Sequence, residues 1–286
     1  INNHIFETIY HAALETSYEI AKKREPHMIQ IKENRKNNKI DKELEEIYKP
    51  VSQELDRDKY LGSYSSFEGS PMSKGQFQFD LWGKSASDRY DWETLRKEIM
   101  IHGTRNSLLV APMPTASTSQ ILGNYECFEP VMSNIYTRRV LSGEYMVLND
   151  YLVKDLRIFD MWNDNMKDML IKNDGSIQKI DGIPQMIKDR YKTAWEIKQK
   201  HILDMASDRG KFICQSQSLN LFVEAPSFKL LSSMHFYGWK KGLKTGIYYL
   251  RRKAKHQAQQ FTIDPSKVEK DEENENENEI CEMCSG

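Results

Sequence analysis

The stretch that decides the fold runs over residues 219–250 and reads LNLFVEAPSFKLLSSMHFYGWKKGLKTGIYYL. Its apolar start predicts a strand over Leu219–Val223, and Ser227 is suited to cap a helix that continues to about Lys241. A second strand is expected over Thr245–Leu250. Because a helical crossover joins parallel strands, the stretch predicts a βαβ unit. Repeated units of this kind close a barrel or build a doubly wound sheet, and the pattern alone leaves both open.

Helices and strands alternate upstream of this unit as well. Asp91 is suited to cap a helix that runs to His102, with Gly103 after it, and a short strand is expected over Asn106–Ala111. A long helix is expected over much of Tyr151–Lys172. Another helix is expected to open at Pro184, to end at Gly210, and to carry one apolar stripe of Ile187, Tyr191, Trp195, Ile202 and Met205. The chain is therefore predicted to be α/β.

The two ends of the chain differ from this pattern. Helical patterning begins in the first residues, as in a fragment of a longer protein. The segment Lys22–Ser63 is rich in charged residues, so we expect a solvated insertion with one helix near Lys42–Tyr48. Residues 1–264 are predicted to form the folded part. Residues 265–286, which include the acidic run Asp271–Glu279, are predicted to form a flexible tail.

Composition narrows the function classes. The 286 residues carry 41 basic and 42 acidic side chains, a formal net charge of -1 that lacks the basic excess of a nucleic-acid binder. No apolar run approaches the ~18 residues that a membrane-spanning helix needs, and no leader pattern opens the chain. Four cysteines do not form a secreted disulfide framework. We expect a cytoplasmic protein that binds neither nucleic acid nor membranes.

The first candidate site is the stretch PMPTASTSQ over residues 112–120, directly after the strand expected to end at Ala111. Two prolines stiffen the turn, and the four hydroxyl side chains of Thr115, Ser117, Thr118 and Ser119 gather where a helix would begin. Backbone N–H groups at a helix start attract phosphate. The alternative is an ordinary helix cap, because Ser and Thr are common capping residues. The pattern leaves both open.

The second candidate is the adjacent pair Tyr248 and Tyr249. Neighbouring aromatic residues in a strand normally serve opposite faces, so the structural alternative is one core ring and one edge ring. For the two rings to stack as a relay, the backbone has to leave regular strand geometry at this point.

The third candidate is the pair Cys281 and Cys284, which follows the acidic run. Such a pair can close a disulfide or form half a zinc site, which Cys127 and Cys214 could complete. About 17 flexible residues before the pair would give a reach of ~20 to 25 Å. That reach would allow thiol exchange in a buried site and with an external reductant. We otherwise expect Cys127 and Cys214 to be small packing residues.

The remaining conspicuous residues are expected to be structural. The seven histidines show no ligand spacing, so no metal site is predicted. The tryptophans are expected to anchor the core: Trp82, Trp92, Trp162, Trp195 and Trp239.

Several long runs together carry a resemblance to a known family. They read NSLLVAPMPTAST over residues 106–118, SNIYTRRVLSGE over 133–144, QSQSLN over 215–220, MHFYGWK over 234–240 and LKTGIYYLR over 243–251. With them, the chain resembles the C-terminal part of the large, catalytic subunit of class I ribonucleoside-diphosphate reductase of the eukaryotic type. The resemblance covers nearly all of the chain except residues 22–63 and the acidic linker.

The resemblance implies a fold and a set of roles. The chain would be the C-terminal part of a ten-stranded α/β barrel that reduces ribonucleoside diphosphates by thiyl-radical chemistry. Thr115, Ala116, Ser117 and Thr118 would hold the substrate diphosphate. Tyr248 and Tyr249 would pass the oxidising equivalent toward the active-site cysteine. Cys281 and Cys284 would re-reduce the active-site disulfide.

The resemblance also implies partners and missing parts. The metal-containing small subunit would supply the radical, thioredoxin or glutaredoxin would recharge the tail, and the full large subunit would form a homodimer. This part would bind no cofactor, and the allosteric nucleotides ATP and dNTP would bind elsewhere. The Asn-x-Cys-x-Glu loop with the radical cysteine is absent, so we expect these 286 residues alone to turn over no substrate. The alternative is a non-catalytic interaction module that docks the small subunit or thioredoxin, with the helix from Ser227 to Lys241 as its surface.

Overall fold

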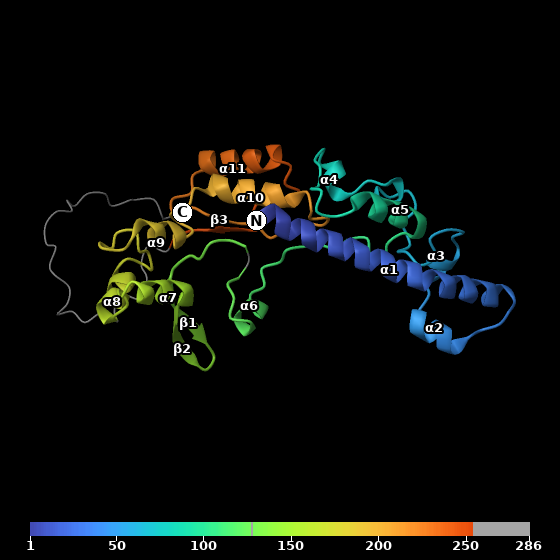
Figure 1. Ribbon diagram of the computed structural model, residues 1–286, viewed down its shortest axis with the longest axis horizontal. Helices are drawn as coiled ribbons and strands as arrows, with labels where there is room; N and C mark the ends of the chain where they lie inside the picture. Colours follow the sequence, from blue (N-terminus) through green and yellow to red (C-terminus); the bar gives the residue numbers. More distant parts are fainter. Residues whose placement is uncertain (127, 254–286) are drawn as a thin grey trace, which may run out of the picture. The chain divides into compact units, whose positions relative to one another are not determined.

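The computed structural model describes residues 1–126 and 128–253, which divide into two compact units (Figure 1). Unit 1 comprises residues 1–130 and 194–253, and unit 2 comprises residues 131–193. Unit 1 contains α1 (Asn2–Lys36), α2 (Lys42–Tyr48), α3 (Ser52–Leu55), η1 (Met72–Lys74), α4 (Gln78–Leu81), α5 (Trp92–His102), α6 (Thr118–Ile121), α10 (Gln199–Gly210), β3 (Asn220–Phe222), α11 (Phe228–Lys240) and β4 (Tyr249–Arg251). Unit 2 contains β1 (Ile135–Val140), β2 (Gly143–Leu148), α7 (Asp150–Ile158), α8 (Asp164–Lys172) and α9 (Gln185–Arg190).

The βαβ unit expected over residues 219–250 is confirmed. β3 and β4 pair in parallel, with Asn220 opposite Tyr249, and α11 connects them. Ser227 caps α11, because its hydroxyl accepts a hydrogen bond from the Leu230 N–H at 3.2 Å. Both strands are shorter than expected, and β4 begins only at Tyr249.

A third extended segment runs beside β3. The N–H of Gln215 donates to the Val110 carbonyl at 3.2 Å, and the N–H of Ser218 donates to the Pro112 carbonyl at 3.0 Å. Residue numbers rise together along both segments, so they run in parallel. The regular strand expected over Asn106–Ala111 is wrong, however. Part of the backbone here donates to a cysteine sulfur instead of to a carbonyl ladder.

The segment Lys22–Ser63 is folded, and the prediction that it covers little core is wrong. α1 continues through most of its first half to Lys36, with buried side chains every three or four residues. The C-terminal end of this stripe contributes to a small core of Met28, Ile31, Leu55 and Leu61. The short helix expected near Lys42–Tyr48 is confirmed as α2.

A buried ion pair joins the two ends of this segment. The Arg24 guanidinium lies 3.0 Å from the Glu54 carboxylate, and both side chains are less than a tenth exposed. Arg105 approaches the other oxygen of Glu54 at 3.6 Å. A Cβ at Gly62 would lie 2.0 Å from the Ala21 carbonyl oxygen, so only glycine allows this close approach to α1.

The helix predicted from Asp91 to His102 is confirmed as α5. The Asp91 carboxylate accepts hydrogen bonds from the Thr94 hydroxyl at 2.6 Å and from the Thr94 N–H at 3.0 Å, and these two bonds hold the pKa of Asp91 below its usual range. Gly103 ends the helix with φ of 76°. α5 and α1 share the largest aromatic core of unit 1, which includes Phe6, Tyr10, Phe67, Phe77, Phe79, Trp92 and Phe212.

Two long helices expected from the sequence are each two helices. The stretch Tyr151–Lys172 breaks after α7, because Asp160 adopts a left-handed φ of 55° and Asn163 caps α8. The expected helix from Pro184 to Gly210 divides into α9 and α10. Its apolar stripe serves two cores, since Ile187 and Tyr191 pack in unit 2 whereas Trp195 and Ile202 pack in unit 1. Met205 is 47% exposed and belongs to neither.

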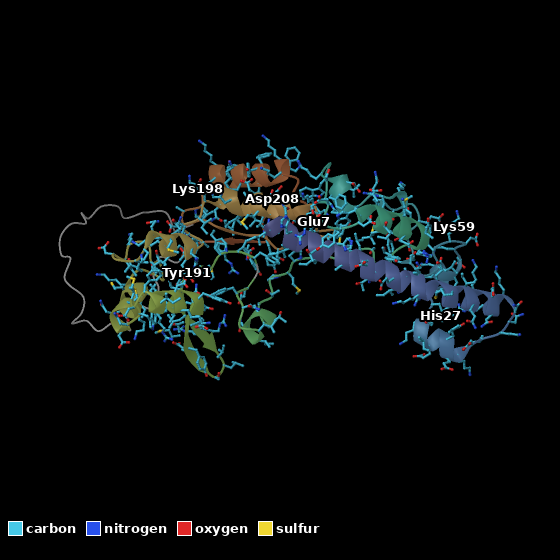
Figure 2. All side chains as sticks on the ribbon, in the orientation of Figure 1. Glu7, His27, Lys59, Tyr191, Lys198 and Asp208 are labelled. Atoms are coloured by element: carbon cyan, nitrogen blue, oxygen red, sulfur yellow. The ribbon has the colours of Figure 1, made fainter. Side chains whose placement is uncertain are left out.

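Unit 2 is an antiparallel hairpin followed by three short helices. Asn134, 1% exposed, holds the unit together: its amide donates to the carbonyls of Gly175 at 2.9 Å and Tyr191 at 3.1 Å. Tyr191 is labelled in Figure 2. Its hydroxyl donates to Asp155 at 2.8 Å. Burial, and then this hydrogen bond, raises the pKa of Tyr191 to about 12.

The described strands form two two-stranded sheets and no closed barrel within residues 1–126 and 128–253. The architecture is therefore mixed helix and sheet, in agreement with the α/β prediction. None of the described helices has both the length and the apolar character that crossing a membrane requires. The predicted flexible tail lies outside the described residues.

The buried stripe of α1 makes a stability prediction. Met28→Ala removes a fully buried side chain and should lower the free energy of unfolding by about 2–5 kcal/mol. Ile29→Ala is the matched control, because Ile29 is 41% exposed and should change the free energy by less than about 0.5 kcal/mol. Urea unfolding followed by circular dichroism measures both. Equal, near-zero effects would restore the solvated-insertion hypothesis.

Candidate functional site

Three parallel extended segments of unit 1 organise the candidate site, and we call them the three-segment sheet: residues 110–112, 215–223 and 248–251. The middle segment bonds to the first through Gln215 and Ser218. It bonds to the third at its own centre, where the Tyr248 N–H donates to the Leu219 carbonyl at 2.7 Å. Residues on one segment are therefore in fixed register with residues on the others.

The hydroxyl-rich loop, residues 112–120, follows the first segment. Thr115 adopts a left-handed φ of 51° and turns the chain into the four-residue helix α6. Ser117 stands at the N-cap position, yet its hydroxyl makes no capping hydrogen bond. The ordinary-cap alternative therefore has no support in this geometry.

Free donors gather at the turn of this loop. The N–H groups of Ala116, Ser117 and Thr118 donate to no group within the part of the chain that the structure describes, and all three residues are exposed. Unsatisfied N–H groups of this kind can bind an anion. Ser119 differs, because it is only 5% exposed and its hydroxyl finds no hydrogen-bond partner among the described residues. The sequence pattern placed Ser119 among the four converging hydroxyls, whereas the residues implied by the family resemblance end at Thr118.

Tyr248 and Tyr249 lie in direct contact. Their ring centroids are 4.3 Å apart and their planes make an angle of 62°, an edge-to-face pair rather than a stacked one. Tyr248 immediately precedes β4, so the backbone has the departure from regular strand geometry that the relay required. Both side chains are 50% exposed.

The start of the loop and the tyrosine pair lie at the same position along the strand direction of the three-segment sheet. Ser218 is bonded to Pro112, the last residue of the first segment, and the next residue, Leu219, is bonded to Tyr248. The backbones of the loop start and of Tyr248 are thus separated by two strand spacings, roughly 10 Å. The sequence did not predict this shared position, since the first segment contains no regular strand.

Two side chains fasten the sheet: Cys214, which the sequence predicted as a small packing residue, and Lys244, to which it gave no role. The Cys214 sulfur accepts the N–H groups of Leu109 at 2.9 Å and Val110 at 3.1 Å, so it is more than a packing residue. The Lys244 ammonium donates to the carbonyls of Ile213 at 2.9 Å and Cys214 at 2.7 Å. Burial lowers the pKa of Lys244, and the Cys214 thiol opposes this effect.

The glutamine at position 217 in the QSQS run fixes the middle segment to α10. Its side-chain amide donates to the Ala206 carbonyl at 2.9 Å, and its oxygen accepts from Arg209 Nε at 2.7 Å. Arg209 is 3% exposed, and burial lowers the pKa of its guanidinium. Its remaining neighbours include the rings of Phe6 and Phe128.

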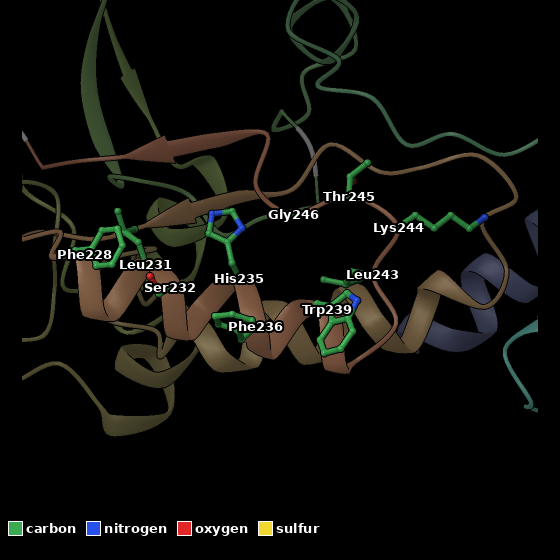
Figure 3. A pocket seen from close by; sticks show the side chains of 10 residues that line it. All are labelled: Phe228, Leu231, Ser232, His235, Phe236, Trp239, Leu243, Lys244, Thr245 and Gly246. Carbon is green, nitrogen blue, oxygen red and sulfur yellow. The ribbon is translucent and has the colours of Figure 1, made fainter.

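An open apolar groove of about 690 Å³ lies along α11 (Figure 3). Its lining includes Phe228, Phe236, Trp239 and Leu243, and Gly246 closes one side just before the tyrosine pair. Trp239 is 71% exposed, so its prediction as a core anchor is wrong, whereas the prediction for Trp92, 7% exposed, is confirmed.

The opposite side of α11 packs on α10 (Figure 1). The Tyr237 hydroxyl donates to the Asp204 carboxylate at 2.6 Å, and Lys241 lies 3.0 Å from Asp204. These two hydrogen bonds hold the pKa of Asp204 below its usual range. The groove is therefore the face of α11 that α10 leaves uncovered.

Cys281, Cys284 and Cys127 lie outside the described residues, so their predicted roles stay predictions. Within residues 1–126 and 128–253, no three His, Cys, Asp or Glu side chains converge as ligands of a metal ion.

Comparison with known proteins gives consistent matches. A family model described as ribonucleotide reductase, barrel domain, matches residues 1–249. The chain is 50% identical to the ribonucleoside-diphosphate reductase large subunit of Caenorhabditis elegans, over 100% of this chain and 32% of that protein. It is 53% identical to the ribonucleoside-diphosphate reductase large chain 2 of Saccharomyces cerevisiae, over 92% of this chain and 26% of that protein.

A solved structure, the class Id ribonucleotide reductase alpha subunit of Actinobacillus ureae, is 29% identical, with a TM-score of 0.48 over 57% of this chain and 31% of that one. The chain spans about a third of the length of the curated relatives it matches.

The Lys244 bonds make a prediction for the site's rigidity. Lys244→Met leaves two carbonyls without their donor and should lower the free energy of unfolding by about 1–3 kcal/mol. Lys240→Met, which changes an exposed lysine at the end of α11, should have almost no effect. Hydrogen exchange of the Tyr248 N–H, which donates to the Leu219 carbonyl, would locate the loss. Unchanged exchange there would contradict the fastening role.

Proposed function

Because the chain belongs to the barrel-domain family of ribonucleotide reductases, we propose that it forms the C-terminal part of a ribonucleoside-diphosphate reductase large subunit. In the full chain this part would serve the reduction of ribonucleoside diphosphates to deoxyribonucleoside diphosphates by thiyl-radical chemistry. The observation that carries the proposal is the contact of the Tyr248 and Tyr249 rings at 4.3 Å, at the level of the hydroxyl-rich loop.

The substrate diphosphate is proposed to bind at residues 115–118. The three free N–H groups of Ala116, Ser117 and Thr118 supply donors to phosphate oxygens, and the side chains of Thr115, Ser117 and Thr118 supply hydroxyls. The left-handed φ of Thr115 supports this role, because it places a tight turn directly before these donors. The uncapped state of Ser117 supports it as well.

The tyrosine pair is proposed to relay a one-electron oxidising equivalent that the small subunit's radical supplies. In the step between them, a hydrogen atom passes from one phenol to the other phenoxyl radical. One O–H bond breaks and the other forms, so one tyrosine is oxidised, its neighbour is reduced, and the proton travels with the electron. Edge-to-face contact at 4.3 Å brings the two rings close enough for this exchange.

The small subunit is proposed to dock at the apolar groove of α11. The groove is bordered by Thr245 and Gly246, which lead directly into Tyr248. A partner seated there would bring its oxidant to the tyrosine pair. The exposed rings of Phe236 and Trp239 supply the apolar surface that such a partner would cover.

The rest of the machinery belongs to the full chain and its partners. This chain is proposed to supply the C-terminal part of a ten-stranded barrel, whereas the rest of the barrel, the radical cysteine and the sites for ATP and dNTP are proposed to lie in the part that the relatives have beyond this match. Cys281 and Cys284 are proposed to re-reduce the active-site disulfide and to be recharged by thioredoxin or glutaredoxin. The full large subunit is proposed to be a cytoplasmic homodimer, with its metal in the small subunit.

The relay predicts the effect of one hydroxyl. In the full-length large subunit with its small subunit, Tyr249→Phe keeps the ring but removes the O–H that the transfer requires. Formation of deoxyribonucleoside diphosphate should fall to background in a turnover assay. Tyr151→Phe, at a tyrosine 60% exposed in unit 2, should keep its turnover. Undiminished product from Tyr249→Phe would refute the relay and favour a non-catalytic docking module.

The diphosphate site predicts a loss of substrate binding. Ser117→Ala combined with Thr118→Val removes two hydroxyls that would donate to a charged group, each worth about 1.5–3 kcal/mol. We expect kcat/KM to fall by at least about a hundredfold, through KM first. Ser142→Ala in the hairpin of unit 2 is the control. An unchanged KM in the double variant would show that these two hydroxyls do not bind the substrate.

A further inference from the structure

Arg251 is a third member of the group formed by the tyrosine pair. It follows Tyr249 by two residues in β4, so both side chains leave the same face of the strand. The guanidinium carbon lies 4.8 Å from the centroid of the Tyr249 ring. Arg252, the next residue, contacts no aromatic ring within the described part of the chain.

The charge of Arg251 is directed at the ring and not at a carboxylate. Among the described residues, no acidic side chain forms an ion pair with Arg251. Its register partner on β3 is the apolar Phe222. The carboxylate nearest in register, Glu224, is paired with Lys253 at 3.6 Å. Tyr249 is therefore the described group that Arg251 is positioned to influence.

A cation above a phenol ring is attracted to the negative potential of its π face. Oxidation of the tyrosine removes an electron from this π system while the phenolic proton leaves, so the radical ring attracts the cation less. The cation thus favours the reduced form of the ring that it covers.

On the premise of the proposed relay, we propose that Arg251 is a positioning residue that biases the oxidising equivalent away from Tyr249 and toward Tyr248. In the exchange a hydrogen atom passes from the Tyr249 phenol to the Tyr248 phenoxyl radical. Arg251 disfavours this transfer because it stabilises the reduced form of Tyr249. A cation–π contact at an exposed site is worth ~0.5–1 kcal/mol, which corresponds to about a two- to fivefold change in the distribution. Tyr249 is thereby prevented from becoming a trap.

The test measures the distribution directly in the full-length large subunit with its small subunit and substrate. Tyr248→3-aminotyrosine and Tyr249→3-aminotyrosine, in separate proteins, place an easily oxidised ring at each position, and electron paramagnetic resonance quantifies each radical. The measured quantity is the yield at position 249 divided by the yield at position 248. Arg251→Met should raise this ratio about two- to fivefold. Arg251→Lys, which keeps a cation, should raise it less.

Arg252→Met is the matched control, because it removes an adjacent arginine without a described ring contact, and it should leave the ratio unchanged. A constant ratio in Arg251→Met, or an equal rise in Arg252→Met, would overturn the role of Arg251 while leaving the relay intact. Absence of any radical at both positions, with a native circular dichroism spectrum, would instead overturn the relay, and the role of Arg251 with it.

Discussion

Parallel hydrogen bonding across the three-segment sheet is the constraint on which the site depends. The middle segment is shared: its start is bonded to the strand-like residues before the hydroxyl-rich loop, and Leu219 is bonded to Tyr248. Because parallel register fixes both neighbours against one chain, the loop and the tyrosine pair cannot shift independently along the sheet. Every role proposed for the loop and the pair depends on this register.

The first segment keeps its place although it has no regular ladder. In place of a strand carbonyl, the Cys214 sulfur accepts two N–H groups of the first segment. Lys244 donates to the carbonyls of Ile213 and Cys214. Buried backbone groups have to find partners, and here side chains supply them. Local sequence patterns indicate regular backbone hydrogen bonding, so they predicted a strand at Asn106–Ala111. They carry no signal that side chains replace the backbone partners there.

Elements whose signals are local were predictable from the sequence, whereas assignments that depend on tertiary contacts were not. The caps at Asp91 and Ser227 and the parallel crossover were read correctly, because a polar cap and a hydrophobic run are visible within a few residues. The α1 stripe was missed beyond its start, because buried positions 17, 21 and 24 carry Ser, Ala and Arg. The composition therefore predicted a solvent-exposed segment. The buried positions are nevertheless regularly spaced, and the Glu54 carboxylate neutralises the buried charge of Arg24.

The short length of β4 and the contact of the two rings are the same structural fact. Had the strand run from Thr245 to Leu250 as expected, regular alternation would have sent Tyr248 and Tyr249 to opposite faces. Since regular pairing begins only at Tyr249, Tyr248 escapes the alternation and turns its ring to its neighbour. Tyr249 and Arg251, both inside the strand, obey the alternation and share a face. One strand boundary therefore determines which of the three side chains meet.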